Sequence, residues 1–298
     1  MLILLTGYNG FLGKSILKGL RDKSEFLTLS RSSGDYKVSL EKEIPNFKQN
    51  FKLVIHAAGK AHSIPKTGAE KKEFYDVNVL GTLNLLKGLE KCGLPKEFVF
   101  ISSVSVYGLE IGNNISEEHS LLARDSYGLS KIEAERVVKK WCGDNQVVCT
   151  ILRLPLLVGE NPPGNLGAMV KAINRGYYFN IGGGVAKKSM VLAKDVASFI
   201  PIVAPIGGIY NLTDGVHPSF SELSLEISKS KKEQFSLPLP IAKLIAKIGD
   251  FLGTKAPINS LKLKKITSDL VFDDSKARGL LNWKPESVLD YLKRENLV

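Results

Sequence analysis

The sequence predicts an α/β fold in which a doubly wound parallel sheet is followed by a smaller, helix-rich C-terminal part. Uninterrupted apolar runs at 2–5, 53–55 and 98–101 are typical of strands covered on both faces. Helical patterns lie between or after them, at 70–91 and about 127–142. Alternating strands and helices with short connections indicate parallel βαβ units.

The remaining elements extend this pattern along the chain. Leu12, Ile16, Leu17 and Leu20 lie on one face of a first helix, and apolar runs predict further strands at 26–29, 147–152 and 208–212. Loops at 161–164 and 181–184 interrupt the alternation. We expect residues 1–160 plus about 190–214 to form the sheet domain, and 161–189 plus 215–298 to form the second domain.

Composition is that of a folded globular protein, because hydrophobic residues make up 44% and charged residues 24% of the 298. The three cysteines, at 92, 142 and 149, are odd in number and lack metal-binding spacing, so we expect reduced thiols and no metal site. The short apolar run at 2–5 leads straight into a glycine turn, and no segment is apolar enough to span a membrane. These features predict a cytoplasmic protein.

Positive charge is concentrated in one segment of the chain, whose net charge is +11 overall. Residues 229–265 contain nine lysines against two acids, Glu233 and Asp250, a local excess of 9 − 2 = +7. Arginines and interleaved aromatic residues are missing there, so nucleic acid is not an expected partner. A phosphorylated substrate, an anionic membrane surface and a solvated basic face all remain open.

A glycine-rich turn, Gly7-x-x-Gly10-x-x-Gly13, separates the first strand from the first helix. Glycine permits a tight turn, close approach of backbone N–H groups to a pyrophosphate, and close packing of helix on strand. The helix N-terminus adds a partial positive charge toward the phosphates. Since the turn lies between the appropriate two elements, the sequence predicts dinucleotide binding on a Rossmann-type sheet.

The residues after the second strand bear on which dinucleotide binds. An acid there would bind the ribose of NAD, whereas an arginine can pair with the 2′-phosphate of NADP. The chain has Arg31 within Ser30–Ser33 and no acid until Asp35. This favours NADP over NAD, although Arg31 could also stack on adenine and admit both.

A possible acid/base pair, Tyr127 and Lys131, lies on one face of the helix near 127–142, because the residues are four apart. A neighbouring ammonium favours the phenolate, which would make the tyrosine a usable general acid/base. Ser102 and Ser103 follow the strand at 98–101, at the edge where ligands bind in such sheets. The serines could instead only cap the strand end, and Tyr-x-x-x-Lys alone is a weak signal.

Taken together, the motifs resemble those of the extended short-chain dehydrogenases, of the NAD-dependent epimerase/dehydratase type, which act on nucleotide sugars. The resemblance covers nearly the whole chain. It is carried by the glycine turn and by residues 55–59, 78–82, 102–108, 127–131, 152–155, 210–212 and 274–283.

The resemblance implies roles for individual residues. Ser103, Tyr127 and Lys131 match the catalytic set, and Asn78 matches an asparagine that supports the active-site helix. Cofactor contacts are implied for Gly7, Asn9, Gly10, Phe11, Leu12, Gly13, Arg31, Ala57, Ala58, Gly59, Asn78, Ile101, Ser102, Tyr127, Lys131 and Leu154. Substrate contacts are implied for Ser103, Tyr127, Asn165, Leu166 and Lys188, where Lys188 replaces a phosphate-binding arginine and loses its bidentate geometry.

The implied activity is oxidation or reduction at C4 of a nucleotide-linked hexose or hexosamine, with a UDP-sugar as the expected substrate, for surface polysaccharide biosynthesis. Val104 and Ser105 stand where the dehydratases of the family carry carboxylates, which disfavours dehydration. The sequence supports a 4-epimerase and a 4-ketoreductase almost equally. A lipid-diphosphate-linked sugar, a non-sugar alcohol or ketone and a non-catalytic NADP-binding regulator are the alternatives. The resemblance also implies a homodimer formed through helices near 75–91 and 127–142.

The segment from Pro240 to Leu252 is predicted to form a basic amphipathic helix. Ile241, Leu244, Ile245, Ile248 and Leu252 share one face, and Lys243 and Lys247 lie on another. Such a helix can lie on an anionic membrane. The ordinary interpretation is that its apolar face packs into the core of the second domain.

Overall fold

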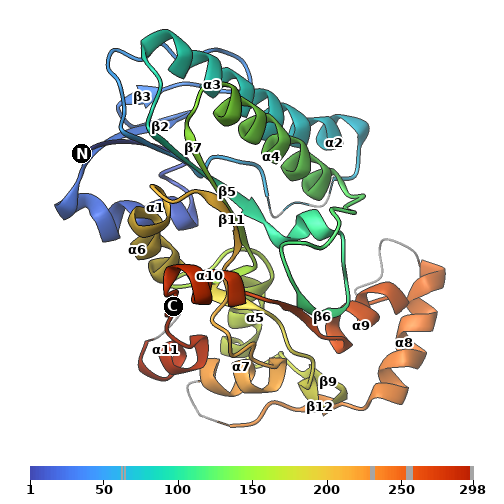
Figure 1. The fold of residues 1–298 in the computed structure, drawn as a ribbon. Coiled ribbons are helices and arrows are strands. Elements are labelled where there is room, and N and C mark those ends of the chain that lie inside the picture. The colour runs from blue at the N-terminus through green and yellow to red at the C-terminus, as the bar shows by residue number, and fades with distance from the viewer. Residues whose placement is uncertain (62, 64, 229–231, 253–257, 296–298) are drawn as a thin grey trace.

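The chain folds around a seven-stranded sheet of order β11-β7-β5-β4-β1-β2-β3, in which every pair is parallel (Figure 1). This computed structural model describes all residues except 62, 64, 229–231, 253–257 and 296–298. The expected α/β class with a doubly wound sheet is confirmed. The strands are β1 Leu2–Thr6, β2 Glu25–Ser30, β3 Tyr36–Lys37, β4 Leu53–His56, β5 Glu97–Ser103, β7 Val148–Leu154 and β11 Gly208–Asn211.

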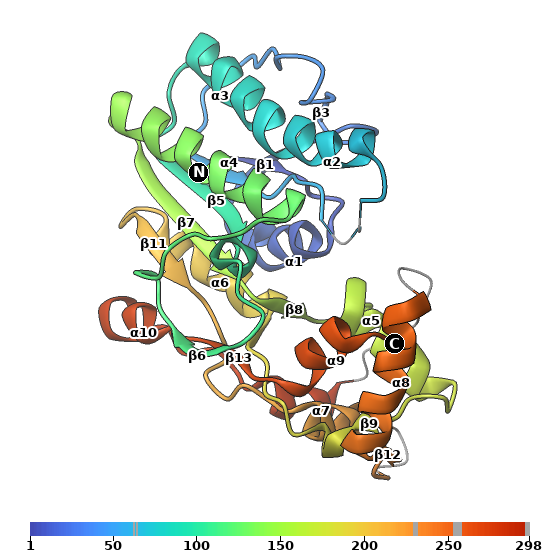
Figure 2. The same cartoon turned by 90° about the vertical axis from the view of Figure 1, so that its right-hand side faces the viewer.

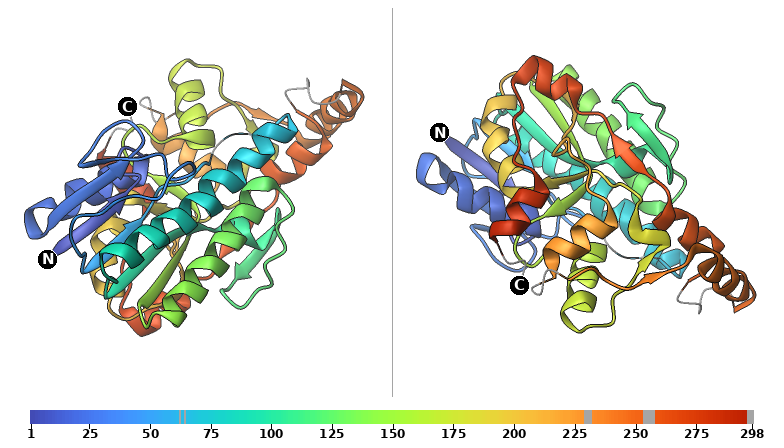
Figure 3. Two further views of the ribbon diagram at one scale, coloured as in Figure 1. Left: turned by 90° about the horizontal axis from the view of Figure 1, so that it is seen from above. Right: turned by 90° about the horizontal axis from the view of Figure 1, so that it is seen from below.

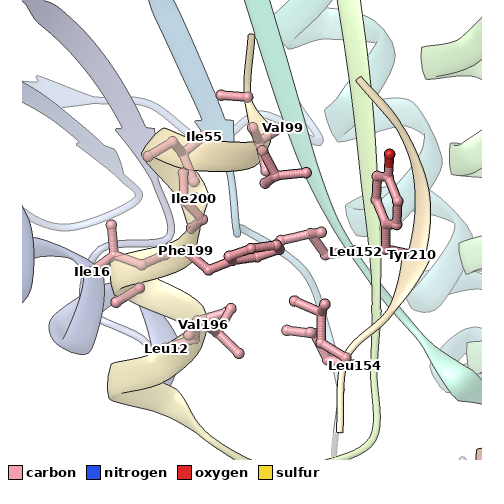
Figure 4. Close-up of a cluster of buried hydrophobic side chains, with 14 of the residues drawn as sticks. Leu12, Ile16, Ile55, Val99, Leu152, Leu154, Val196, Phe199, Ile200 and Tyr210 are labelled. Carbon is pink, nitrogen blue, oxygen red and sulfur yellow. The ribbon is translucent and has the colours of Figure 1, made fainter. Parts of the chain in front are cut away.

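Helices cover both faces of the sheet, which explains why its central strands have no polar alternation. On one face lie α1 (Phe11–Leu20) and α6 (Ala193–Val203), whose apolar side chains meet those of the strands in Figure 4. The other face is covered by α3 (Gly81–Cys92) and α4 (Ser126–Asp144), preceded by α2 (Gly68–Tyr75) (Figures 1 and 3). One turn of π-helix, Asp76–Leu80, joins α2 to α3.

The rest of the chain forms a second group of elements beside the sheet (Figure 2). Its largest core gathers side chains from two paired short strands and three helices. These are β8 Leu156–Val158, β10 Met190–Leu192, α5 Gly164–Asn174, α7 Phe220–Ile227 and α11 Val288–Arg294. Around them lie β6 Gly112–Ile115 with β13 Leu270–Phe272, β9 Asn180–Ile181 with β12 Ser236–Leu237, α8 Leu239–Leu252 and α9 Ser260–Thr267. The helix α10 Ser275–Leu281 packs instead against the sheet.

The packing of one late segment bears on where the second domain ends. Ala277, Leu281 and Trp283 pack in the core shared by α1 and α6, and the Trp283 ring lies 4.6 Å from that of Phe199. This segment therefore lies with the sheet domain, although it falls inside the range 215–298 assigned to the second domain. For the other residues we propose the domain division given above, with 1–160 plus about 190–214 as the dinucleotide-binding domain.

A buried ion pair connects α4 to the sheet. Arg153 of β7 donates to both carboxylate oxygens of Glu135 of α4, at 3.1 and 2.8 Å, and the two side chains are only 4% and 2% exposed. Ser102 of β5 donates to the same carboxylate, and Arg153 also donates to the Tyr107 hydroxyl oxygen at 3.1 Å. Because every charged oxygen and nitrogen of the pair has a partner, its desolvation is offset.

Removal of one partner should therefore be costly. We expect Glu135→Gln to lower the free energy of unfolding by about 3–5 kcal/mol, because the Arg153 guanidinium stays buried without its counter-charge. Urea titration followed by circular dichroism measures this.

The matched control is Glu133→Gln on the same helix, whose exposed pair with Arg136 should change the unfolding free energy by less than about 1 kcal/mol. Equal losses for the two variants would contradict this account of the buried pair.

Candidate active site

The carboxyl ends of four neighbouring strands place the candidate site at one edge of the sheet. Parallel register puts Thr6 beside His56 and Ser103 beside Leu154. The glycine turn follows β1, residues 57–59 follow β4, and Ser102–Ser103 ends β5. In such sheets this edge is the ligand-binding edge.

The glycine turn packs directly against the segment after β4. Gly7 has φ +71°, and a Cβ built on it would lie 2.6 Å from the Ala58 nitrogen and 2.7 Å from the Ala57 carbonyl carbon. A Cβ on Gly13 would lie 2.2 Å from the Gly7 oxygen. These two glycines therefore serve backbone packing, and they bring Ala57 and Ala58 beside the turn as the resemblance implies.

The middle glycine has a different environment. A Cβ on Gly10 would meet only the Gly7 oxygen, at 3.1 Å, among the described atoms. Gly10 precedes α1, which begins at Phe11, and among the described residues no side chain caps the first N–H groups of that helix. Uncapped donors beside a residue without a side chain form a cradle that fits a dinucleotide pyrophosphate. The Leu12 side chain itself is part of the core.

A buried histidine holds this edge together, and our reading of the sequence assigned it no role. His56 contacts the Thr6 hydroxyl through Nδ1 at 2.6 Å and the Thr82 hydroxyl through Nε2 at 2.9 Å. Burial, followed by the positive charge of Lys131, lowers the pKa of His56 to about 3. The ring is therefore neutral, and it links β1, β4 and α3.

The loop after β2 lies against the glycine turn. The Asn9 amide donates to Ser33 Oγ at 2.7 Å, and Ser30 Oγ donates to the Ser33 carbonyl oxygen at 2.9 Å. Asp35 points back into β2, where its carboxylate accepts from the Thr28 backbone N–H and hydroxyl, both at 2.8 Å. These hydrogen bonds lower the pKa of Asp35.

Arg31, in the same loop, is 69% exposed and lies 3.9 Å from a carboxylate oxygen of Glu41. Its guanidinium therefore remains accessible at the end of β2, while the first acid after the strand is occupied elsewhere.

Asn78 lies in the π-helical turn and connects two parts of the site. Its Oδ1 accepts from the Lys60 backbone N–H at 2.7 Å, and its Nδ2 donates to Ser130 Oγ at 2.8 Å. Ser130 in turn donates to the Tyr127 carbonyl oxygen at 2.7 Å. A π-turn often marks a functional position, and here it fixes the loop after β4 relative to the start of α4. Ser130 was missed from sequence, although it lies directly before Lys131.

Lys131 is buried between α4 and the ends of β4 and β5. Its Nζ donates to the Ile101 carbonyl oxygen at 2.8 Å and lies 4.7 Å from the centre of the Phe100 ring. A Cβ on Gly59 would lie 3.3 Å from this Nζ, so glycine permits the close approach. Burial lowers the pKa of Lys131 to about 8, with the Glu135 carboxylate opposing that shift.

Tyr127 lies in the first turn of α4, where the Asp125 carboxylate accepts from the Tyr127 and Gly128 N–H groups at 3.1 and 3.0 Å. Burial raises the pKa of the Tyr127 phenol, and a hydrogen bond with Ser103 opposes that rise. Lys131 was expected to favour the phenolate, but the pKa of the phenol is raised, and the Lys131 ammonium donates to the Ile101 carbonyl oxygen. The structure thus brings Tyr127 and Ser103 together, with Lys131 one helical turn away.

Three further residues predicted to contact a cofactor lie at the same edge. Ile101 offers its carbonyl oxygen to Lys131, and Leu154 is buried beside Ser103. The Ser102 hydroxyl is used by Glu135, so only its backbone remains for a ligand.

The residues predicted to hold the substrate carrier lie in the second group of elements. Asn165 is exposed in the first turn of α5, whereas the Leu166 side chain is buried in the core beside β8. Lys188 donates to the carbonyl oxygens of Lys265 and Ser268, both at 2.9 Å. Its ammonium thus binds the C-terminal end of α9 in this structure.

The arrangement can hold a dinucleotide along the glycine turn and move a proton through Tyr127, with Ser103 as its hydrogen-bonding neighbour. These are the parts of an alcohol-oxidising or ketone-reducing site.

Comparisons with known proteins place this geometry in a family. The family model described as "NAD dependent epimerase/dehydratase family" matches residues 3–212. N-acetyl-alpha-D-glucosaminyl-diphospho-ditrans,octacis-undecaprenol 4-epimerase of Escherichia coli O157:H7 is 30% identical, over 93% of this chain and 88% of its own. UDP-glucose 4-epimerase of Vibrio cholerae is 29% identical, over 96% of this chain and 92% of its own.

Among solved structures, UDP-glucose 4-epimerase of Thermotoga maritima, determined with UDP-glucose, superposes with a TM-score of 0.75. It is 21% identical and covers 98% of this chain and 96% of its own, a likeness of fold. The family match over residues 3–212 and the relative at 30% identity agree with the motifs at the carboxyl edge of the sheet. The chain belongs to the NAD dependent epimerase/dehydratase family.

Proposed function

We propose that this protein oxidises or reduces C4 of a nucleotide-linked hexose or hexosamine, as a 4-epimerase or 4-ketoreductase. The observation that carries the proposal is the placement of Tyr127, Ser103 and Lys131 at the same sheet edge as an uncapped glycine turn. The E. coli and V. cholerae relatives, both named as 4-epimerases, support C4 as the reacting carbon.

Each residue of the set has a distinct part in this proposal. Tyr127 takes the proton of the C4 hydroxyl or returns it to the C4 oxygen, and Ser103 hydrogen-bonds the same oxygen. Lys131, one helical turn from the phenol and hydrogen-bonded to the Ile101 carbonyl oxygen, holds the cofactor ribose. A bound nicotinamide dinucleotide supplies hydride transfer at C4. Asn78 is a positioning residue, because it acts through Ser130 and Lys60.

The cofactor is a nicotinamide dinucleotide, and we favour NADP over NAD. Arg31 is accessible after β2, and Asp35 is engaged with Thr28. Glu41 near Arg31 weakens the preference, since its charge opposes a 2′-phosphate. Proposed contacts along the dinucleotide come from the glycine turn (Gly7, Asn9, Gly10, Phe11, Leu12, Gly13), from Ala57, Ala58 and Gly59, and from Ile101, Ser102 and Leu154.

Epimerisation and ketone reduction remain the two candidate outcomes. The named relatives favour epimerisation, whereas the accessible Arg31 favours a reductase that consumes NADPH. Val104 and Ser105 follow Ser103 in a 3₁₀ turn, and neither can act as the paired carboxylates of a dehydratase. Dehydration is therefore not proposed.

A UDP-sugar is the proposed substrate. Both UDP-glucose 4-epimerases, from V. cholerae and T. maritima, match this chain along nearly its whole length. Of these three proteins, the E. coli relative alone has a lipid-diphosphate carrier in its name. A lipid-linked sugar is therefore not favoured as the substrate. Asn165, the Leu166 backbone and Lys188 are the proposed carrier contacts, and Lys188 would first have to leave the end of α9.

We propose a homodimer and a cytoplasmic location. A homodimer would pair the exposed sides of α3 and α4. A cytoplasmic location accords with three cysteines that are all free thiols.

The function is tested by incubating the protein with UDP-glucose, UDP-N-acetylglucosamine and a UDP-4-keto-6-deoxyhexosamine, each with and without NADPH. Interconversion of C4 epimers without net loss of NADPH identifies an epimerase, and stoichiometric NADPH loss with the keto sugar identifies a reductase. NMR of the products and absorbance at the nicotinamide band provide the readouts. No change in any of the sugars would contradict the proposal.

Tyr127→Phe removes only the proposed acid/base hydroxyl. We expect kcat to fall by about 10²–10⁴-fold while dinucleotide affinity stays within about twofold, because the ring still packs against Phe74. Tyr177→Phe, at an exposed tyrosine, is the matched control and should retain full activity. Activity in Tyr127→Phe equal to that of the control would remove the phenol from the mechanism.

Gly10→Ala tests the cradle. Among the described atoms the new methyl group meets only the Gly7 oxygen, at 3.1 Å, a tight contact that a shift of a few tenths of an ångström relieves. We therefore expect the variant to fold but its dinucleotide binding to weaken by about tenfold or more. Gly143→Ala, where the added Cβ meets no described atom within 4 Å beyond the neighbouring backbone of its own helix, is the control. Isothermal titration with NADPH and NADH measures both. Unchanged affinity in Gly10→Ala would place the dinucleotide elsewhere.

A further inference from the structure

Helix α8 is oriented with its large apolar side chains facing outward. Ala242, Ala246 and Gly249 form its buried side, and the two alanines pack with Leu263 of α9. The opposite side is a continuous exposed apolar face, between 41% and 93% exposed at each residue, made of Ile241, Leu244, Ile245, Ile248 and Phe251. The ordinary expectation, that the apolar face of this helix packs into the core, is wrong for these residues; Leu252 lies outside the described side chains.

This apolar face is bordered by positive charge. Lys243, Lys247 and Phe251 follow one another at intervals of four residues, so the two lysines lie along the flank of the face. Both are exposed. The only acid of the helix, Asp250, accepts hydrogen bonds from the backbone and hydroxyl of Ser260. The surrounding segment 229–265 carries nine lysines against two acids.

The position of α8 leaves this face accessible. In Figures 1 and 3, α8 and α9 stand at the periphery, away from the sheet and its helices. In the part of the chain that the structure describes, no helix is both long and apolar enough to cross a bilayer. The face is therefore suited to lie in a surface rather than to span one.

We propose that the outward face of α8 docks the protein onto an anionic lipid bilayer. An apolar face flanked by lysines matches the boundary between acyl chains and negatively charged headgroups. A second copy of the chain is a poorer match, because a two-fold contact through α8 would bring two segments of charge +7 together. The docking surface lies outside the proposed catalytic residues and is independent of the reaction at C4.

Sedimentation of the full chain with vesicles tests this docking. Vesicles of equal parts phosphatidylglycerol and phosphatidylcholine should bind the protein, less strongly as sodium chloride is raised, and vesicles of phosphatidylcholine alone should bind little. Leu244→Ser with Ile248→Ser should weaken binding to the anionic vesicles by about tenfold or more. Both side chains are exposed, so the unfolding transition should stay unchanged.

The matched control is Ile202→Ser with Leu280→Ser, which removes two exposed apolar side chains elsewhere and should bind vesicles like the unaltered protein. No association with anionic vesicles, or equal association of the α8 variant, would overturn the proposal. The proposal would also be overturned if sedimentation velocity showed that the unaltered protein is a dimer that does not bind vesicles and that the α8 substitutions make it monomeric. Turnover of a soluble UDP-sugar by the α8 variant separates failure of docking from failure of the proposed reaction.

Discussion

The Glu135 carboxylate, buried between Arg153 and Ser102, is the interaction on which the candidate site depends most. It fixes α4, which carries Tyr127 and Lys131, to the ends of β5 and β7. Through Arg153 the network continues to the Tyr107 hydroxyl, which donates to Asn211 at 2.7 Å. Two charges buried at this depth are tolerable only with full hydrogen bonding, so the geometry of the helix relative to the sheet is narrowly determined.

A second constraint is the lack of side-chain volume where segments cross at the sheet edge. Gly7 packs on Ala57 and Ala58, and Gly59 leaves room for the Lys131 ammonium. Small residues at these crossings let the backbone after β1 approach the backbone after β4, and let the latter approach Lys131 of α4. A neutral His56 then joins the same strands through hydroxyl groups without introducing another buried charge.

Much of this was predictable from the sequence because the signals are local. Uninterrupted apolar runs predict β1, β4 and β5, and the spacing of Tyr127 and Lys131 places them on one helical face. The π-turn around Asn78 was not predictable, because the helical pattern at 70–91 runs through it without a break. Trp283 packs against Phe199, a pairing set by tertiary contacts between segments 84 residues apart (283 − 199).

One residue, Lys188, and one helix, α8, show what the sequence alone could not predict. Lys188 was expected to face a phosphate, but its ammonium binds the end of α9, since charge alone does not reveal which acceptor lies nearby. The periodicity of α8 identifies an apolar face correctly. It does not reveal that the small residues, rather than the large ones, meet the neighbouring helix.

The central claim is that C4 of the sugar gains its hydrogen directly by transfer rather than from water. The test is to run the reaction in D₂O and to examine C4 of the product by NMR. It applies equally to an epimerase and to a reductase supplied with NADPH. Both cases predict protium at C4, because the hydrogen never exchanges with solvent. Deuterium at C4 would mean that a carbanion is protonated there, which would contradict the proposed reaction.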